Sequence, residues 1–229
     1  MKIYRWKFLQ KGFKSSNGNL KWKIGEWNTV KDELKMCKVG FHCSKDAYNA
    51  FSYVQGEILV KVECRGKHLE DKNKECWEEQ RVVKAYKWTK KDSVSLAIFS
   101  AKLVIGIYEK QYPNDNRPRK AIEAAVRYQK NPTKKNRLAA NTAANAAHAA
   151  ANAATNVTNI ATYAAANAAY AAANAAANVT NMATHAVAYT AYVANAVANA
   201  ATNAAHVATI KKIKQFFVKQ VKSLREIKS

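Results

Sequence analysis

The sequence predicts an α+β N-terminal domain followed by an all-α domain, an Ala/Asn-rich helical bundle. Two observations predict this fold class. In residues 1 to about 90, apolar and polar residues alternate over short runs, which is the pattern of half-buried strands. Residues 138–210 contain no Asp, Glu, Lys, Arg, Gly or Pro, and 35 of these 73 residues are alanine, the strongest helix former. We therefore divide the chain into residues 1–91 and residues 92–229.

The chain carries a formal net charge of +22, and this charge is unevenly distributed. Residues 138–210 contribute none of it, Lys211–Ser229 contribute +6, and residues 1–137 contribute +16. A field of this sign favours an acidic partner, either a nucleic acid or the acidic face of a protein. An AT-rich genome, in which Lys and Asn codons are frequent, would produce the same charge without such a partner.

All four cysteines lie in the first 80 residues. No apolar segment follows the first basic residues, so we expect no signal peptide and free thiols in the reducing cytoplasm of a bacterial host. The gap between Cys37 and Cys43 is not that of a usual zinc knuckle, and no second close pair follows. We expect no metal, no cofactor and, because Asn recurs throughout residues 138–210, no membrane span.

The alternating region predicts short strands and one short helix. Ser15–Asn19 is rich in turn residues and separates two alternating runs. Glu57–Cys64 is the clearest strand, and we expect Gly66 to end it. In chain order, the predicted elements are strands at residues 3–8 and 20–24, a helix from Ser44 or Lys45 to Tyr53, and strands at residues 57–64 and 81–88.

The segment from Gly40 to Gly66 is similar in layout to the middle of ADP-ribosyltransferase folds. In those folds a strand ends in a Gly-aromatic step, and a Ser/Ala/Tyr helix and a further strand follow. The resemblance implies that Glu78 or Glu79 stands where that family keeps a catalytic glutamate. A strand–helix–strand unit with a structural role is the alternative.

Residues 1 to about 90 also resemble an uncharacterised domain that is common in phage and prophage proteins. The resemblance rests on a Trp/Lys strand, a turn at Ile24–Glu26 and a Cys-x-x-Gly-Phe-His motif at Cys37–His42. It implies no established activity. We therefore expect a structural role for Gly40, Phe41 and His42.

Residues 92–137 predict two helices that are joined by a proline-containing turn. A strongly apolar run up to Tyr108 predicts a buried helix. Pro118 suits the first position of the next helix. We expect Asp115 to pair with Arg117 or Arg119 and so to fix the turn. The predicted structural residues of this motif are Asp115, Arg117, Pro118, Arg119 and Glu123.

Residues 95–210 resemble the bacterial "putative immunity protein" family of toxin–immunity systems. The resemblance rests on Tyr108-Glu, the run Pro-Asn-Asp-Asn-Arg-Pro-Arg at residues 113–119, the helix Ala-Ile-Glu-Ala-Ala at residues 121–125, and later Ala-Ala-His-Ala-Ala and His-Ala-Val-Ala steps. This chain has Asn where the family has interspersed Arg, Asp and Glu. The resemblance implies a helical domain that takes part in toxin neutralisation.

The alanine-rich stretch repeats itself with an offset of 22 residues, because residues 145–163 match residues 167–185. Two 11-residue units span about six helical turns, so equivalent positions lie on one helix face. The alternatives are one continuous helix and a bundle that folds back near Asn156 and Asn178. We favour the bundle because an isolated alanine helix has no core. The predicted polar stripe consists of Asn145, Asn152, Asn156, Asn159, Asn167, Asn174, Asn178 and Asn181.

Ile210–Lys228 predicts an amphipathic helix with an apolar face and a lysine-rich face. We expect it to cap the core of the bundle, and binding to a membrane surface or a partner helix is the alternative. Its lysines and the basic segment before the alanine-rich stretch supply the candidate partner-binding residues. They are Arg117, Arg119, Lys120, Arg127, Lys130, Lys134, Lys135, Arg137, Lys211, Lys212 and Lys214.

Taken together, these features predict a non-enzymatic protein of phage or bacterial origin that neutralises a partner by direct binding. The partner is a protein effector, either a toxin or a defence effector such as a CRISPR nuclease, with or without its bound nucleic acid. One alternative is a nucleic-acid-binding accessory protein that uses the basic segment and the tail. The other is an ADP-ribosyltransferase-like enzyme in the N-terminal domain.

Overall fold

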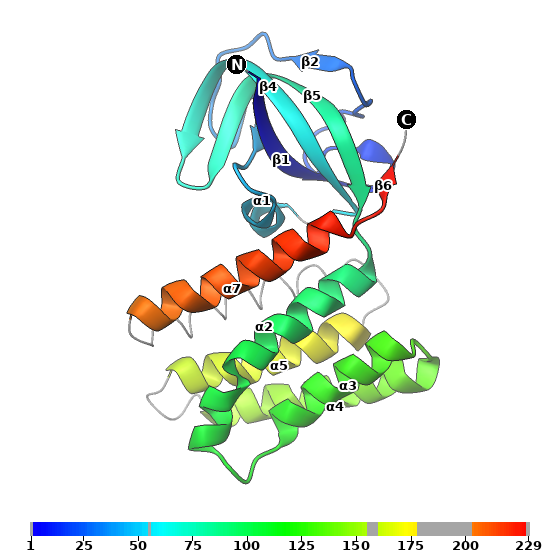
Figure 1. Cartoon of the computed structure of the whole chain (residues 1–229), viewed down its shortest axis with the longest axis vertical. Coiled ribbons are helices and arrows are strands. Elements are labelled where there is room, and N and C mark those ends of the chain that lie inside the picture. Colours follow the sequence, from blue (N-terminus) through cyan, green and yellow to red (C-terminus); the bar gives the residue numbers. More distant parts are fainter. Residues whose placement is uncertain (1, 55, 155–159, 178–202, 228–229) are drawn as a thin grey trace. The chain divides into compact units, whose positions relative to one another are not determined.

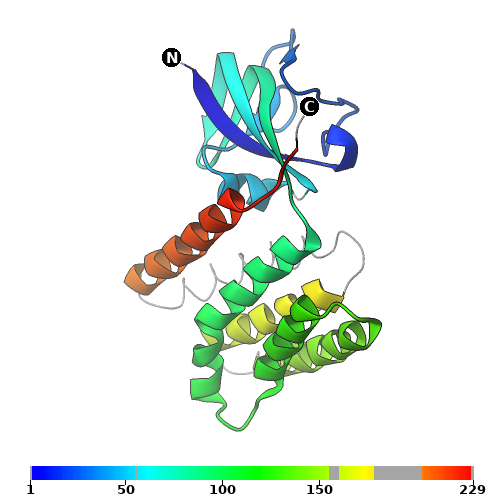
Figure 2. The same ribbon diagram turned by 45° about the vertical axis from the view of Figure 1, so that its right-hand side comes forward.

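The computed structural model describes residues 2–54, 56–154, 160–177 and 203–227 (Figures 1 and 2). The chain divides into two compact units, which we describe separately. Residues 1–89 and 218–229 form the sheet unit, and residues 90–217 form the helical unit. The prediction that a sheet-containing region precedes a helical region is confirmed.

The sheet unit contains a six-stranded sheet whose pairings are antiparallel. Its centre is the hairpin of β4 (Ile58–Asp71) and β5 (Lys74–Lys87). On its free side, β4 pairs with β1 (Ile3–Leu9), which is followed by a 3-10 turn at Lys11–Phe13. On its free side, β5 pairs with three short strands, namely β2 (Trp27–Thr29), β3 (Phe41–Cys43) and β6 (Glu226–Ile227).

Both sides of the sheet bury apolar residues, because side chains alternate along each strand. Leu9 of β1 belongs to a buried cluster on one side. Phe8 packs on the other side against Phe51 of helix α1 (Ala47–Tyr53), with 5.3 Å between the ring centroids. Asp46 caps α1 by accepting a hydrogen bond from the backbone N of Asn49. The buried cluster consists of Leu9, Trp22, Cys43, Ile58, Val60, Val62, Cys64, Trp77, Val82 and Ala85.

Three sequence predictions for this unit are wrong in extent. The β4 strand does not end at Gly66 but continues to Asp71; Gly66 has φ +82° and lies where the register with β5 shifts. The β5 strand starts at Lys74, well before the predicted residue 81, because β4 supplies a partner for its whole length. Residues 20–24 make only isolated bridges. The predicted turn at residues 15–19 is present and is closed by a 2.9 Å hydrogen bond from Ser15 N to Leu20 O.

The helical unit is a bundle around α5 (Ile160–Ala177). Three helices pack against α5, namely α2 (Lys90–Gln111), α3 (Arg117–Lys130) and α4 (Lys134–Ala154). Ten alanines between Ala165 and Ala177 are buried, so this described part of α5 has no broad exposed face. The distance between packed helices depends on the side chains at the contact, and alanine lets several neighbours approach one central helix. The composition of the uncharged stretch thus suits a central helix.

Helix α4 contains residues 145–154 of the first repeat copy and α5 contains residues 167–177 of the second, and these two helices run antiparallel and side by side (Figures 1 and 2). His148 and Tyr170 occupy equivalent repeat positions, and their rings contact each other with centroids 4.9 Å apart. A single continuous helix is therefore excluded for residues 134–177. Helix α4 ends at Ala154 and α5 begins at Ile160, on either side of the fold-back predicted near Asn156. Asn156 and Asn178, the two predicted fold-back positions, lie outside the described residues.

The predicted asparagine stripe does not share one environment. Asn145 is exposed on α4, whereas its repeat equivalent Asn167 is only 1% exposed on α5. The difference arises because α5 is surrounded by helices and α4 has a solvent face. Asn156, Asn159, Asn178 and Asn181 lie outside the described residues.

Helix α7 (Asn203–Lys222) ends before the predicted end of the tail helix. Its residues Ile213 and Phe217 are buried, and Phe216 stacks on Phe99 of α2 with centroids 4.1 Å apart. The prediction of a helix up to Lys228 is wrong, because the chain leaves the helix and forms β6 along β5. The last turn of a helix leaves backbone carbonyl groups without partners in the helix. The edge of β5 presents backbone N–H and C=O groups, with which residues in a strand can pair. No helix in the described part of the chain is long and apolar enough to cross a membrane.

Candidate functional site

The turn between α2 and α3 is held by the side chain of Asp115. Its carboxylate accepts a 2.6 Å hydrogen bond from Oη of Tyr108. It also accepts bonds from the backbone N, Nε and Nη2 of Arg117, at 3.1, 2.9 and 2.7 Å. Arg117 holds the pKa of Asp115 well below its usual value, while burial and Asp115 raise the pKa of the Tyr108 hydroxyl. Both groups therefore keep one protonation state near neutral pH, as in a structural network.

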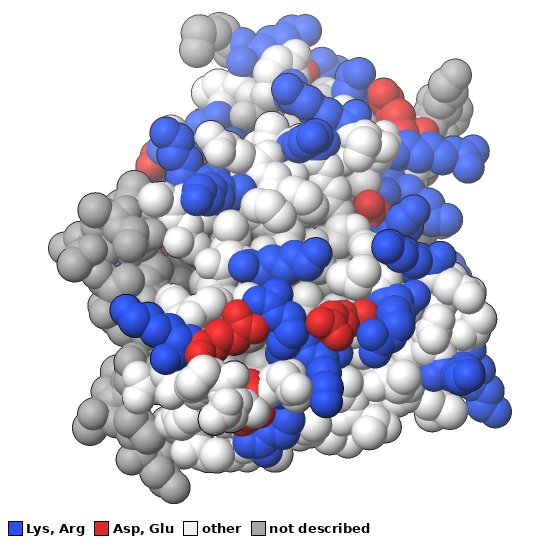
Figure 3. All heavy atoms as spheres, turned by 60° about the horizontal axis from the view of Figure 1, so that its bottom comes forward, with Lys and Arg blue, Asp and Glu red and all other residues white. Residues whose placement is uncertain are grey.

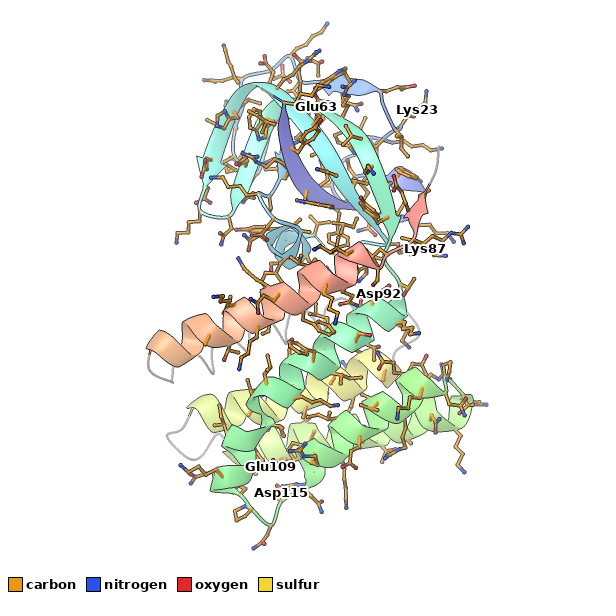
Figure 4. All side chains as sticks on the ribbon, in the orientation of Figure 1. Lys23, Glu63, Lys87, Asp92, Glu109 and Asp115 are labelled. Carbon is orange, nitrogen blue, oxygen red and sulfur yellow. The ribbon has the colours of Figure 1, made fainter. Side chains whose placement is uncertain are left out.

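Arg119 and Glu109 form a second ion pair at the same turn. Nε and Nη2 of Arg119 each donate to one carboxylate oxygen of Glu109 at 2.6 Å, a bidentate arrangement. This pairing holds the pKa of Glu109 below its usual value. Figure 4 shows Glu109 and Asp115 at the same end of the helical unit, far along α2 from Asp92. We call the set of Tyr108, Glu109, Asp115, Arg117 and Arg119 the α2–α3 clasp.

The clasp engages two residues that the sequence suggested for partner binding. The guanidinium groups of Arg117 and Arg119 bind carboxylates of their own chain. Arg127 lies 4.0 Å from Glu123, and both side chains are more than half exposed, so that pair is weak. Pro118 is buried in the first turn of α3.

Basic residues gather where α3 ends and α4 begins. Lys130, Lys134, Lys135 and Arg137, which we call the basic cluster, have no carboxylate partner among the described residues. Thr133 caps α4, because its Oγ1 accepts a 3.2 Å hydrogen bond from Asn136 N. Two of the lysines therefore occupy the first turn of α4, where the helix macrodipole disfavours positive charge. On the face drawn in Figure 3, acidic side chains are fewer than basic ones and lie among them.

The remaining predicted basic residues lie on other parts of the helical unit. Lys120 is exposed on α3. Lys211 and Lys212 are exposed on α7, and Lys214 is half-buried there. The sequence grouped all the candidate basic residues by charge, whereas the fold distributes them over α3, α4 and α7.

The Gly-Phe-His motif of the sheet unit has a packing role. Gly40 has φ +122°, and a Cβ at this position would overlap Sγ of Cys76. Nε2 of His42 accepts a 2.9 Å hydrogen bond from the backbone N of Cys37. Burial lowers the pKa of His42, which suits a neutral ring that accepts this bond.

The zinc hypothesis and the ADP-ribosyltransferase-like hypothesis each depend on residues whose contacts the structure describes. No group of three or more His, Cys, Asp and Glu residues in the described ranges is arranged to hold a metal ion. Glu79 binds Arg65 at 2.7 Å, and Glu78 accepts a 2.9 Å hydrogen bond from Lys67 N. Both glutamates thus hold neighbouring parts of the sheet.

Sequence reasoning missed a pocket of about 440 Å³ in the sheet unit. Lys7 lines it and lies on the same side of β1 as Leu9 of the buried cluster. The signal was present in the alternation of the first strand, because Lys7 has the parity of the apolar residues Ile3 and Leu9. The Glu109–Arg119 pair was also missed, since it joins two helices.

Comparison with known proteins gives two matches. A family model described as "Imm-5 like putative immunity protein" matches residues 69–226. A model of a domain of unknown function, DUF7666, matches residues 3–91. No curated protein and no solved structure matches the chain. The resemblance of the helical region to the immunity protein family and that of the N-terminal region to an uncharacterised domain are thereby confirmed.

Proposed function

Because the chain belongs to the Imm-5 like immunity protein family, we propose that it binds a toxin protein directly and thereby neutralises it. The family match is the observation that carries this proposal. The matched residues 69–226 include both the α2–α3 clasp and the basic cluster. A binding role also suits the clasp, whose charged groups are engaged with one another and serve to fix a surface turn.

We assign the toxin contact to the basic cluster. Lysines in the first turn of a helix oppose its macrodipole, at a cost of about 0.3–1 kcal/mol each. No described carboxylate offsets this cost at Lys134 or Lys135. An acidic face of a partner would supply the missing charges, which strengthens encounter rate and specificity. The expected toxin therefore presents a carboxylate-rich surface.

The proposal is tested by capture followed by a growth assay. The immobilised full chain is incubated with bacterial lysates, and each captured polypeptide is then expressed alone. A polypeptide that arrests growth alone, and no longer does so when the full chain is co-expressed, supports the proposal. A captured defence nuclease that is inhibited instead would assign the partner to the other class of effector. Absence of any neutralised polypeptide contradicts both.

A matched pair of variants locates the contact. Changing Lys130, Lys134, Lys135 and Arg137 to Glu should weaken toxin binding at least about tenfold. The control changes Lys2, Lys31, Lys67 and Lys72 of the sheet unit, which are all exposed, to Glu. It alters the net charge equally and should leave binding intact. Equal losses in both variants would show that only the overall charge matters.

A second candidate function is nucleic-acid binding, which the charge of the helical unit favours. Residues 90–217 contain fifteen Lys and Arg residues against four Asp and Glu residues. Binding of DNA or RNA that weakens steeply between low and physiological salt would support this candidate. Neutralisation of a toxin that survives nuclease treatment would exclude nucleic acid as the bridging partner.

A further inference from the structure

The pocket in the sheet unit has the size of a small-molecule site. Its volume of about 440 Å³ falls in the range of roughly 300–1,000 Å³ that is usual for ligand pockets. It lies between β1, the turn that follows it, the segment that contains β3, and α1. All its described lining residues belong to the sheet unit, so the pocket is complete within that unit.

Lys7 places a cationic group on the core side of the sheet. Its Nζ lies 4.2 Å from the ring centroid of Trp22 and 3.3 Å from Oε1 of Gln80. No carboxylate among the described residues pairs with it. Glu75, a buried acid of the same unit, is bound to Arg5 at 2.6 Å and to Nε1 of Trp77 at 2.7 Å. A lysine among apolar side chains is rare without a partner for its charge.

The other charged groups of the pocket have the same sign. Lys38 and Lys74 line it together with Lys7, and none of its described lining residues is Asp or Glu. Lys38 is exposed, and Nζ of Lys74 lies 2.9 Å from Sγ of Cys37. Burial lowers the pKa of Lys7 to about 8, which is the direction expected for an ammonium group without a counter-charge. An anion in the pocket would remove this penalty.

The neutral residues of the pocket indicate what else the anion carries. Ser15, Ser16 and Asn17 of the turn after β1 contribute hydroxyl and amide groups that can donate hydrogen bonds. Phe41 contributes an aromatic ring whose centroid lies 5.9 Å from Nζ of Lys7, and a planar group can stack on it. The pocket is therefore cationic and donor-rich, with an aromatic part of its wall.

We propose that this pocket binds a small phosphorylated molecule with a planar ring, of mononucleotide size, with its phosphate at Lys7. Lysine ammonium groups bind phosphate as point charges, without the bidentate fork by which arginine holds carboxylates and phosphates alike. No arginine lines the pocket among the described residues. A pocket of about 440 Å³ has room for one small molecule. This site belongs to the sheet unit, and its test does not depend on the proposed toxin.

The test measures binding of ADP and of pyrophosphate to the full chain by isothermal titration calorimetry. ADP should bind at least tenfold more tightly than pyrophosphate, because the ring adds contacts. Lys7→Met should weaken ADP binding at least tenfold, and Lys67→Met, which changes an exposed lysine outside the pocket, should leave it unchanged. If Lys7→Met does not fold, Lys38→Ala replaces it, with a several-fold loss expected.

Four results would overturn the proposal. The first two are no binding of ADP and equal affinity for pyrophosphate and ADP. The third is an ADP affinity that Lys7→Met, or Lys38→Ala in its place, leaves unchanged. The fourth is a loss of ADP affinity in Lys67→Met as large as that in the pocket variant. The position of the ligand has an independent readout in Cys37, the one exposed cysteine, which lines the pocket. ADP should slow the reaction of this thiol with a disulfide reagent several-fold. Cys37→Ser should remove this reaction, because the other three cysteines are buried. Bound ADP that leaves the reaction rate unchanged would place the ligand elsewhere.

Discussion

Asp115 and Lys7 are two charged side chains whose surroundings act in opposite directions. Asp115 receives its hydrogen bonds from a guanidinium, a backbone amide and a phenol, so its charged form is favoured. Lys7 faces a tryptophan ring and an amide oxygen, so its charged form is disfavoured. The pKa of each side chain is lowered, but the consequence for stability differs in sign because one is an acid and the other a base.

Replacing Asp115 by Asn should destabilise the helical unit. The substitution removes the charge that binds Arg117, at an expected cost of about 1–3 kcal/mol in the free energy of unfolding. Urea denaturation followed by circular dichroism measures this cost. The control Glu123→Gln breaks only the exposed 4.0 Å pair with Arg127 and should change stability by less than about 0.5 kcal/mol. Equal effects of the two substitutions would refute a special role of the clasp.

The contribution of Asp115 should also depend on pH. Its pKa is lower in the folded state than in the unfolded state, so its stabilising effect is present above the unfolded value near 4 and declines as the pH falls further. The stability difference between the native chain and Asp115→Asn should therefore shrink below about pH 4. A difference that stays constant down to the acid limit would contradict the depressed pKa.

Lys7 predicts the opposite pH window. An unfolded lysine titrates near 10.4, whereas folding lowers the pKa of Lys7 to about 8. Between these values the unfolded state binds more protons, so stability should rise with pH in this interval. Denaturation midpoints of the native chain and Lys7→Met between pH 7.5 and about 10.5 measure the effect. Lys7→Met should lack this rise. If stability changed with pH in the same way in both proteins, folding would not lower the pKa of Lys7.

At the scale of secondary structure, the repeat in the sequence acquires two environments. The same pattern of Ala and Asn forms a helix with a solvent face in α4 and a surrounded helix in α5. Helix propensity therefore accounts for the helical state of the described part of each copy. The number of helices packed around each copy determines which of its alanines can be replaced by a larger residue without loss of stability.

A single enlargement tests this difference. Ala172 of α5 is fully buried, so Ala172→Leu should destabilise the bundle by about 1–3 kcal/mol through overpacking. Ala149 lies on the exposed face of α4, so Ala149→Leu should change stability by less than about 0.5 kcal/mol, because both residues are good helix formers. Thermal melts of the two variants provide the comparison. Similar melting temperatures would contradict the central position of α5.

At the scale of the whole molecule, the sheet unit is formed from both ends of the sequence. Ile227 of β6 lies opposite Ala85 of β5, and Lys87 N donates a 3.0 Å hydrogen bond to Arg225 O. Strand β6 thus joins a sheet whose other strands, among the described residues, precede Thr89. Pairing across such a sequence distance is a non-local contact, whose formation costs loop-closure entropy.

Truncation after Lys222 should therefore weaken the sheet unit. The amide of Lys87 loses its acceptor and should exchange with solvent much faster, and the sheet should lose about 1–3 kcal/mol of stability. Hydrogen exchange read by mass spectrometry resolves β5 from the helices. The control Glu226→Gln removes only the exposed 3.5 Å pair with Lys84 and should leave this exchange unchanged. Unchanged protection of Lys87 in the truncated chain would show that β6 does not hold the β5 edge.

The sequence alone determined the elements that local chemistry controls. Alternation gave β1, turn residues gave the loop at Ser15–Asn19, and the alanine repeat with its fold-back segments predicted separate helices. The Pro-Asn-Asp-Asn-Arg-Pro-Arg run led to the immunity protein family and to a pair between Asp115 and one of the nearby arginines. These features depend on neighbours within a few residues or on a specific motif.

The tertiary structure decided what depends on residues far apart in the chain. Strand β4 continues past Gly66 because β5 pairs with the residues that follow it. Helix α7 ends at Lys222, and the chain after it pairs with the edge of β5 as β6. The fold took Arg119 into a pair with Glu109 and gave Lys7 a place on the core side of a pocket. The physical reason is common to these cases. Burial and the partners of a charge depend on which segments meet in space, and propensity and spacing describe only the segment itself.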